Sequence, residues 1–312
     1  MNKKYAVFTI ILITTILITG VISTVLHQTQ PTPTQTPTPT PTQINPNPIN
    51  PTPINPTPIN PTTPTPTPTP KTTPTQTPAP NTIINYTYTV VKTYPHDTSA
   101  FTQGLVYDNG VLFESTGGFG DSSLRKVNLE DGCILQQYNI PNYFCEGLTL
   151  VNDTLVQLTW QNQIGFIYNK ETFTLLGNFS YKTEGWGLTF DSNKLIMSDG
   201  SAKLTFLDPQ TYQKIGEINV LEGNTPITNI NELEYINGDI YANIWLTQKI
   251  AIINPQTGQI KGWIDLTGIN QHPTTNPDSV LNGIAYDQQT NRLFVTGKNW
   301  PNIYHIEIKP LN

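Results

Sequence analysis

Charged side chains are scarce in this sequence, and so are the residues that bind metals or form disulfides. Asp, Glu, Lys and Arg make up 12% of the 312 residues, and there are two cysteines and four histidines. The net charge is −6, and none of the 22 acidic residues precedes Asp97. Binding to phosphates needs a basic surface, so we expect no nucleic-acid partner. The histidines are too widely spaced to predict a metal site, and we expect no cofactor.

Charge is also missing from one long apolar run near the N-terminus. Lys3 and Lys4 precede an uncharged segment, residues 5–26, that is rich in Ile, Leu, Val and Thr. Its length suffices to cross the hydrocarbon core of a bilayer as a helix, and the preceding lysines favour an N-terminus that stays inside. We predict that residues 1–27 are a transmembrane signal-anchor, with a cleaved signal peptide as the alternative.

Proline is scarce over most of the chain but dense in one stretch. Of the 28 prolines, 19 fall between Pro31 and Pro80, mostly in Thr-Pro dipeptides. Proline at every second or third position excludes both helices and sheets. Residues 28–82 are therefore predicted to be a disordered, extended stalk whose threonines suit O-glycosylation.

The remaining residues, 83–312, are numerous enough to bury one core without help from a metal or a disulfide. Three N-glycosylation sequons, which begin at Asn85, Asn152 and Asn178, suit an extracellular address. We expect a monomeric domain at the cell surface, held outside by the membrane anchor. Secretion after cleavage is the alternative.

The two cysteines, Cys133 and Cys145, leave two possibilities open. In an exported chain a pair twelve residues apart is able to form a disulfide. The other possibility is two buried thiols.

The C-terminal part repeats one pattern five times. Each unit opens with a short apolar segment, followed by a turn and a second apolar segment. The opening segments are residues 104–107, 147–150, 187–190, 232–235 and 283–286, whose starts lie 43, 40, 45 and 51 residues apart. The turns include Asn-Gly at Asn109 and Asn237, a strong signal for a β-hairpin.

A third strand is predicted in every unit, and a fourth in the first four units only. The chain ends before the fifth unit has its fourth strand, but an unassigned strand, residues 87–94, stands ahead of the first unit. Four strands at a period near 43 predict an all-β fold: a five-bladed β-propeller, closed by the N-terminal strand that completes the last blade. A sandwich or a parallel sheet does not account for the repeated order.

In a propeller the first strand of each blade lines the central channel, so side chains at the strand starts converge on the axis. Aromatic, amide and charged residues gather at these starts and at the ends of the second strands, as expected of a small pocket. The candidates at or just before the strand starts are Phe101, Gln103, Phe144, Glu146, Glu184, Trp186, Asn231 and Asn282. Those at the ends of the second strands are Trp160, Asp199, Trp245, Lys298 and Trp300. The alternative for the aromatic residues is that they only plug the channel.

Glu146 is the sharpest candidate among them. Burial beside aromatic rings raises the pKa of a carboxyl group and lets it carry a proton near neutral pH. The alternative is a structural carboxylate that caps backbone amides.

Several motifs in order carry a resemblance to a known family. They are Tyr94-Pro-His-Asp-Thr-Ser-Ala-Phe-Thr-Gln-Gly-Leu, Phe144-Cys-Glu-Gly-Leu, Glu184-Gly-Trp-Gly-Leu, Asn231-Glu-Leu-Glu-Tyr and Thr296-Gly-Lys-Asn-Trp. Over about residues 87–308 the chain resembles the plant and bacterial type of glutaminyl-peptide cyclotransferase. The resemblance implies conversion of the N-terminal glutamine of peptides or proteins to pyroglutamate with release of ammonia. It also implies general acid/base catalysis without a metal.

Carried over residue by residue, the resemblance makes Glu146 the catalytic acid/base. It implies as substrate-binding residues Phe101, Gln103, Phe144, Trp160, Trp186, Asn231, Trp245 and Lys298. A Cys133–Cys145 bridge would be particular to this chain. A different class of function is a non-catalytic propeller, displayed on the surface, that binds peptides or glycans. Glu146 separates the two, because a binding module has no need of an isolated protonatable carboxyl group.

Overall fold

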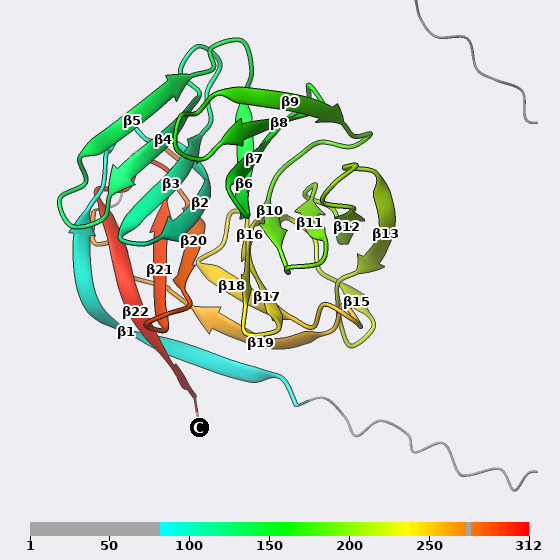
Figure 1. Ribbon diagram of the computed structural model, residues 1–312. Coiled ribbons are helices and arrows are strands. Elements are labelled where there is room, and N and C mark those ends of the chain that lie inside the picture. Colours follow the sequence, from blue (N-terminus) through cyan, green and yellow to red (C-terminus); the bar gives the residue numbers. More distant parts are fainter. Residues whose placement is uncertain (1–81, 273–275, 312) are drawn as a thin grey trace, which may run out of the picture. The chain divides into compact units, whose positions relative to one another are not determined.

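The computed structural model describes residues 82–272 and 276–311 (Figure 1). The predicted anchor, residues 1–27, and the predicted stalk apart from Thr82 lie outside the described residues. All the elements described are β-strands, which confirms the predicted all-β class. Within these ranges there is no helix long and apolar enough to cross a membrane.

The first three units of the repeat each form a separate four-stranded antiparallel sheet with its strands in chain order. The first sheet contains β2 (Thr102–Asp108), β3 (Val111–Thr116), β4 (Ser123–Asn128) and β5 (Ile134–Asn139). The second contains β6 (Cys145–Val151), β7 (Thr154–Thr159), β8 (Ile164–Asn169) and β9 (Leu175–Ser180). The third contains β10 (Leu188–Phe190), β11 (Leu195–Ser198), β12 (Lys203–Leu207) and β13 (Lys214–Asn219).

The last two units share one eight-stranded sheet, in the order β16-β17-β18-β19-β1-β22-β21-β20. Its fourth-unit strands are β16 (Ile230–Ile236), β17 (Asp239–Ile244), β18 (Lys249–Ile253) and β19 (Ile260–Asp265). The others are β20 (Leu281–Asp287), β21 (Arg292–Gly297), β22 (Asn302–Pro310) and the N-terminal β1 (Ile84–Pro95). β1 pairs antiparallel with β22 and, over a shorter stretch, parallel with β19. A small hairpin of β14 (Leu221–Glu222) and β15 (Thr225–Pro226) was not predicted.

Turn chemistry explains the hairpins at the inner edge of these sheets. Asn109 and Gly110, between β2 and β3, have φ of 50° and 89°, and Asn237 and Gly238 have φ of 49° and 96°. Two consecutive residues with positive φ form the tight turn that matches the twist of an antiparallel pair, and Asn-Gly adopts it at the least cost. The Asn-Gly hairpins predicted from the sequence are therefore confirmed.

The glycines that open three of the repeated segments let neighbouring sheets meet closely around the central axis (Figure 1). A Cβ atom on Gly104 would lie 2.4 Å from the backbone nitrogen of Leu148, and one on Gly147 would lie 2.5 Å from that of Leu188. Any side chain at these positions would push the inner strands apart. These glycines therefore allow the first strands of neighbouring sheets to approach one another closely.

The cysteines settle the question that the sequence left open. Both thiols are free: Cys145 is buried at the start of β6, whereas Cys133 is exposed just before β5. A disulfide between them is therefore not part of this structure. Burial raises the pKa of Cys145 to about 12, so its thiol is neutral and packs as a small apolar group.

Candidate functional site

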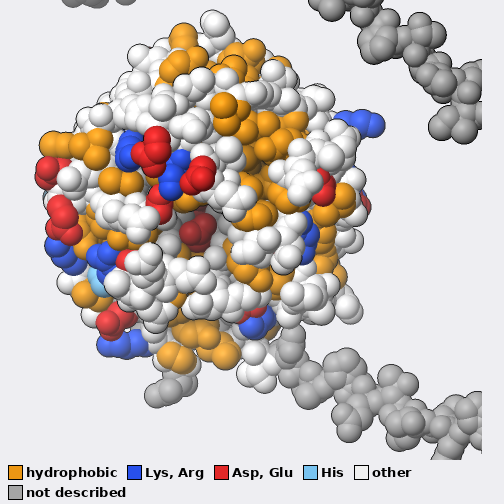
Figure 2. Space-filling model, in the orientation of Figure 1, with side chains coloured by type: hydrophobic (Ala, Val, Ile, Leu, Met, Phe, Trp, Pro, Cys, Tyr) orange, Lys and Arg blue, Asp and Glu red, His pale blue; other side chains and the backbone are white. Residues whose placement is uncertain are grey.

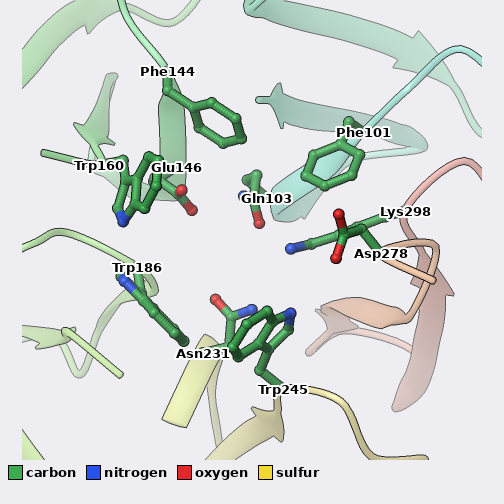
Figure 3. A pocket seen from close by; sticks show the side chains of 10 residues that line it. All are labelled: Phe101, Gln103, Phe144, Glu146, Trp160, Trp186, Asn231, Trp245, Asp278 and Lys298. Atoms are coloured by element: carbon green, nitrogen blue, oxygen red, sulfur yellow. The ribbon is translucent and has the colours of Figure 1, made fainter. Parts of the chain in front are cut away.

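A cavity of about 330 Å³ lies where the inner strands begin, and its walls come from all five units (Figure 3). All nine residues that the resemblance assigns to the pocket line it, whereas the positional candidates Glu184, Asp199, Asn282 and Trp300 are not among its lining residues. The lining consists of Phe101, Gln103, Phe144, Glu146, Trp160, Trp186, Asn231, Trp245, Asp278 and Lys298. Asp278 was not predicted, because it lies in the connection before β20 and belongs to no repeated position.

Bulges in the inner strands aim three polar side chains at the cavity. Gln103, Glu146 and Asn231 are each the second residue of an inner strand, namely β2, β6 and β16. The register of pairing shifts at each of these positions. A bulge frees a residue from the regular pairing and turns its side chain, so the same irregularity supplies one polar group per unit.

The ends of the second strands supply another set of groups. Trp160, Trp245 and Lys298 directly follow β7, β17 and β21. Trp300, the other tryptophan expected at a strand end, is instead buried in the core at 1% exposure and donates its indole N–H to the carbonyl of Ser279 at 3.1 Å. It packs as a structural residue outside the pocket.

The carboxyl group of Glu146 is buried and unpaired. The residue is 4% exposed, and no described side chain forms a hydrogen bond or ion pair with the carboxyl group. Burial raises its pKa well above the ordinary value, the negative charge of Glu184 adds to this, and the positive charge of Lys298 opposes it. The raised pKa favours the neutral, protonated form of Glu146 at the wall of the cavity.

Lys298 is the cation of the pocket. It is 5% exposed, and burial lowers its pKa against the opposing charges of Glu146 and Asp278. Its ammonium nitrogen lies 4.7 Å from the centre of the Phe101 ring, a cation–π contact. Gln103 is fixed separately, because the side-chain amide of Asn282 donates to its Oε1 at 3.0 Å. The amide nitrogen of Gln103 is then left to donate to a ligand.

The aromatic wall is held by edge contacts and by one carboxylate. Ring centres lie 5.6 Å apart for Phe144 and Trp160, and 5.5 Å apart for Trp186 and Trp245. Between these pairs, Oε2 of Glu184 accepts hydrogen bonds from the indoles of Trp160 at 2.7 Å and Trp186 at 3.0 Å. The sequence offers Glu184 as a candidate just before the third opening segment, but no periodicity indicates a carboxylate shared between two units.

A second buried polar cluster lies beside the pocket. His96 forms an ion pair with Glu114 at 2.9 Å, and Thr102 donates to the same Glu114 oxygen at 2.7 Å. The other ring nitrogen of His96 is 2.6 Å from the carbonyl of Trp300. The cluster thus joins β1 to β3 and to the turn that carries Lys298. No motif in the sequence indicated this buried cluster.

Among the residues that the structure describes, no three or more His, Cys, Asp or Glu side chains are grouped so that they could hold a metal ion. The pocket instead combines a protonatable carboxyl group, a buried cation, two amides and five aromatic rings. Such a set suits proton transfer within a small ligand held in a largely apolar cavity.

Comparisons with known proteins point the same way. The family model for glutamine cyclotransferase matches residues 66–308. A glutaminyl-peptide cyclotransferase from Arabidopsis thaliana is 42% identical over 226 residues, which cover 70% of this chain and 71% of the relative. The crystal structure of Myxococcus xanthus glutaminyl cyclase is 38% identical and aligns with a TM-score of 0.71 over 74% of this chain and 100% of the other.

Proposed function

Because this chain belongs to the glutamine cyclotransferase family, it cyclises the N-terminal glutamine of peptides, and we propose that Glu146 moves the proton in that reaction. One observation carries the proposal: a buried carboxyl group without a described partner lies at the wall of an aromatic cavity. Burial raises its pKa, so the group is able to release and to take up a proton near neutral pH.

The atoms that react explain why one carboxyl group suffices. Cyclisation joins the α-amino nitrogen of the substrate to its side-chain carbonyl carbon and breaks the bond from that carbon to the amide nitrogen. The α-amine has a pKa of about 8, so part of it is neutral and nucleophilic at neutral pH. The attacking nitrogen loses one proton and the departing nitrogen gains one, leaving as ammonia. Glu146 carries that proton from one to the other and ends as it began.

Geometry supplies the larger part of the acceleration. The substrate's α-amine and carboxamide belong to one residue and are joined by its flexible side chain, and holding them in contact removes the entropy cost of closing the ring. The aromatic wall forms the slot that confines the chain and excludes water. Gln103, Asn231 and Lys298 orient the carboxamide and stabilise the negative charge that develops on its oxygen.

The test is release of ammonia from a short peptide that begins with glutamine, using the full-length chain purified in detergent. The measurement is made with and without EDTA and beside Glu146→Gln. We expect activity that resists the chelator and is lost in the variant. If a folded Glu146→Gln protein kept full activity, Glu146 would not be the proton carrier.

The same variant distinguishes the enzyme from the non-catalytic alternative. A module that only binds peptides would keep its affinity in Glu146→Gln and would release no ammonia in either form. The family match favours the enzyme, and a chelator-sensitive activity would count against the metal-independent mechanism.

We also propose that the five units are the five blades of a β-propeller, closed by β1 as the outer strand of the last blade. The antiparallel pairing of β1 with β22, from Tyr86 opposite Pro310 to Pro95 opposite Asn302, supports this. Deletion of residues 1–95 should then unfold the domain, whereas deletion of residues 1–81 should leave it folded.

For the rest of the chain we propose an N-terminal membrane anchor, a glycosylated stalk and a monomeric extracellular domain without a nucleic-acid partner. The three sequon asparagines, Asn85, Asn152 and Asn178, are all exposed, which supports the glycoprotein. On the face shown in Figure 2, basic side chains are interspersed with acidic ones, which fits the negative net charge. Extraction by detergent but not by salt, and a mobility shift after N-glycosidase treatment, are the expected results.

A further inference from the structure

Glu184 joins two units of the fold through a single oxygen atom. It lies between β9 and β10, two residues before Trp186. Its Oε2 accepts the indole N–H of Trp160 at 2.7 Å and that of Trp186 at 3.0 Å. Its Oε1 accepts the side-chain amide of Gln161 at 3.1 Å. One carboxylate therefore fixes two tryptophans that come from different sheets and line the same pocket (Figure 3).

The backbone around Glu184 is fixed as well. The amide of Gly185 donates to the carbonyl of Trp160 at 3.1 Å, and the amide of Trp186 donates to the carbonyl of Ser198 at 3.0 Å. A Cβ atom on Gly185 would lie 2.8 Å from the carbonyl of Thr159, so this residue has no room for a side chain. The carboxylate is consequently held at a set position relative to both rings.

The neighbouring rings depend on the same two indoles. Trp160 packs edge-on against Phe144, and Trp186 packs edge-on against Trp245. Glu184 is thus the middle of a continuous wall of four rings. Without this carboxylate, both indoles would lose a charge-assisted hydrogen bond and would be held by ring packing alone.

We propose that Glu184 is a positioning residue for cyclisation: it sets the orientation of Trp160 and Trp186, and through them the slot that holds the substrate, and its negative charge acts on the proton of Glu146. The proposal rests on the proposed role of the pocket. It assigns Glu184 no contact with the substrate.

Electrostatics supports the second part. Burial on its own would raise the pKa of Glu184, but the hydrogen bonds from Trp186, Gln161 and Trp160 outweigh it and lower the pKa, so the group stays ionised. Its charge then adds to burial in raising the pKa of Glu146, against Lys298. The other titratable groups coupled to Glu146 are Cys145 and Tyr181, which burial above all keeps neutral. Glu184 is therefore the nearby anion that favours a protonated Glu146.

Three variants of the full-length chain separate the two parts. Glu184→Gln keeps an acceptor oxygen and removes the charge, Glu184→Ala removes both, and Gln161→Ala removes only the third hydrogen bond as a matched control. Each is measured for kcat and KM on a glutamine peptide, for the pH dependence of kcat, and for near-ultraviolet circular dichroism, which reports the fixed orientation of tryptophans.

Glu184→Ala should lose near-ultraviolet signal and about 10²-fold in kcat/KM, the order of loss expected when reacting groups are displaced by about an ångström. Glu184→Gln should keep the signal and restore most of kcat/KM, but the ionisation of Glu146 in the kcat profile should move to lower pH. Gln161→Ala should stay within about twofold of the wild type in kcat/KM. Where Glu184→Ala does not fold, Glu184→Met replaces it, because it fills the space without an acceptor.

Two results would overturn the proposal. One is an alanine or methionine variant that folds and keeps both the tryptophan signal and kcat/KM. The other is a glutamine variant as impaired as the alanine variant, which would mean that the acceptor oxygen does not matter. The dichroism is independent of turnover, so a failure of the role given to Glu146, seen as full activity in Glu146→Gln, is distinguishable from a failure here.

Discussion

Two buried glutamates on nearby strands have pKa values that are shifted in opposite directions. Glu114, on β3, is 2% exposed and paired with His96. Burial on its own would raise the pKa of Glu114, but the charge and hydrogen bonding around it, mainly from His96, outweigh burial and lower the pKa. Glu146, on β6, is 4% exposed and unpaired, and burial raises its pKa. The two residues are buried to nearly the same extent, so the presence of a charged partner decides the direction of the pKa shift. The structural cluster satisfies its carboxylate, whereas the pocket leaves its carboxyl group available to a ligand.

Two further glutamates lie on β16, of which Glu232 is buried and Glu234 is part-buried. Oε2 of Glu232 accepts the backbone amide of Ile284 at 2.8 Å, and Oε1 of Glu234 accepts that of Tyr286 at 3.2 Å. Burial nevertheless raises the pKa of Glu234 to about 8. These two residues bind backbone amides, the structural role that was the alternative for Glu146. Glu146 does not play that role in this structure.

The largest expected effect comes from removing the unpaired carboxyl group. Glu146→Gln should lower kcat by about 10²–10⁴-fold, the range for a general acid/base. Stability should not fall, because the variant replaces a costly buried carboxyl group by a neutral amide of the same shape. Ammonia release and thermal unfolding of the same sample check both halves. A large drop in unfolding temperature would mean that Glu146 is a structural residue.

The matched change in the paired cluster should have the reverse effect. Glu114→Gln leaves His96 buried without its counter-charge and should lower the free energy of unfolding by about 3–5 kcal/mol. Activity per folded molecule should be retained at a temperature where the variant is folded. Chemical denaturation and ammonia release measure the two quantities. A Glu114→Gln variant that is stable but inactive would contradict a structural role for Glu114.

The pH dependence of stability should differ between the two glutamates. The pKa of Glu146 is raised in the folded chain, so this group favours folding most below its ordinary value of 4.5, and the advantage is lost as pH rises toward the folded pKa. Glu114 has a lowered pKa, so its contribution is present above 4.5 and is lost as pH falls. Unfolding temperatures across this range should decline less with rising pH in Glu146→Gln than in the wild type. An identical decline would contradict the raised pKa.

The smallest effect is expected at the exposed cysteine. Cys133→Ser should change the free energy of unfolding by less than about 0.5 kcal/mol, because the thiol is free and at the surface. A disulfide with Cys145 would instead cost about 2–4 kcal/mol on removal. Denaturation of the variant with and without a reducing agent distinguishes the two cases.

The repeat was the part of this molecule most accessible from sequence. Recurring glycines and Asn-Gly turns follow from close strand contacts and positive φ, and these are local demands that show in the sequence. Position at strand starts and ends predicted a larger set that included Asn282 and Trp300, and the family resemblance selected the nine residues that line the pocket.

Other groups were inaccessible because they depend on contacts between units. Asp278 lies in a connection outside the repeat, and Glu184 acts on a tryptophan of another sheet. His96 and Glu114 are 18 residues apart in the sequence, and they meet because β1, which precedes His96, pairs with β22 at the other end of the chain. The free thiols likewise follow from placement, since Cys145 is buried and Cys133 is at the surface.

The most direct test of the account is the titration of Glu146 itself, followed by carbon-13 NMR of the glutamate carboxyl groups in the wild type and in Glu146→Gln. We predict one resonance that titrates well above the ordinary pKa of 4.5, is missing from the variant, and shifts when a glutamine peptide enters the pocket. A resonance assigned to Glu146 that titrates at or below 4.5 would contradict the claim that this carboxyl group is held ready to carry a proton.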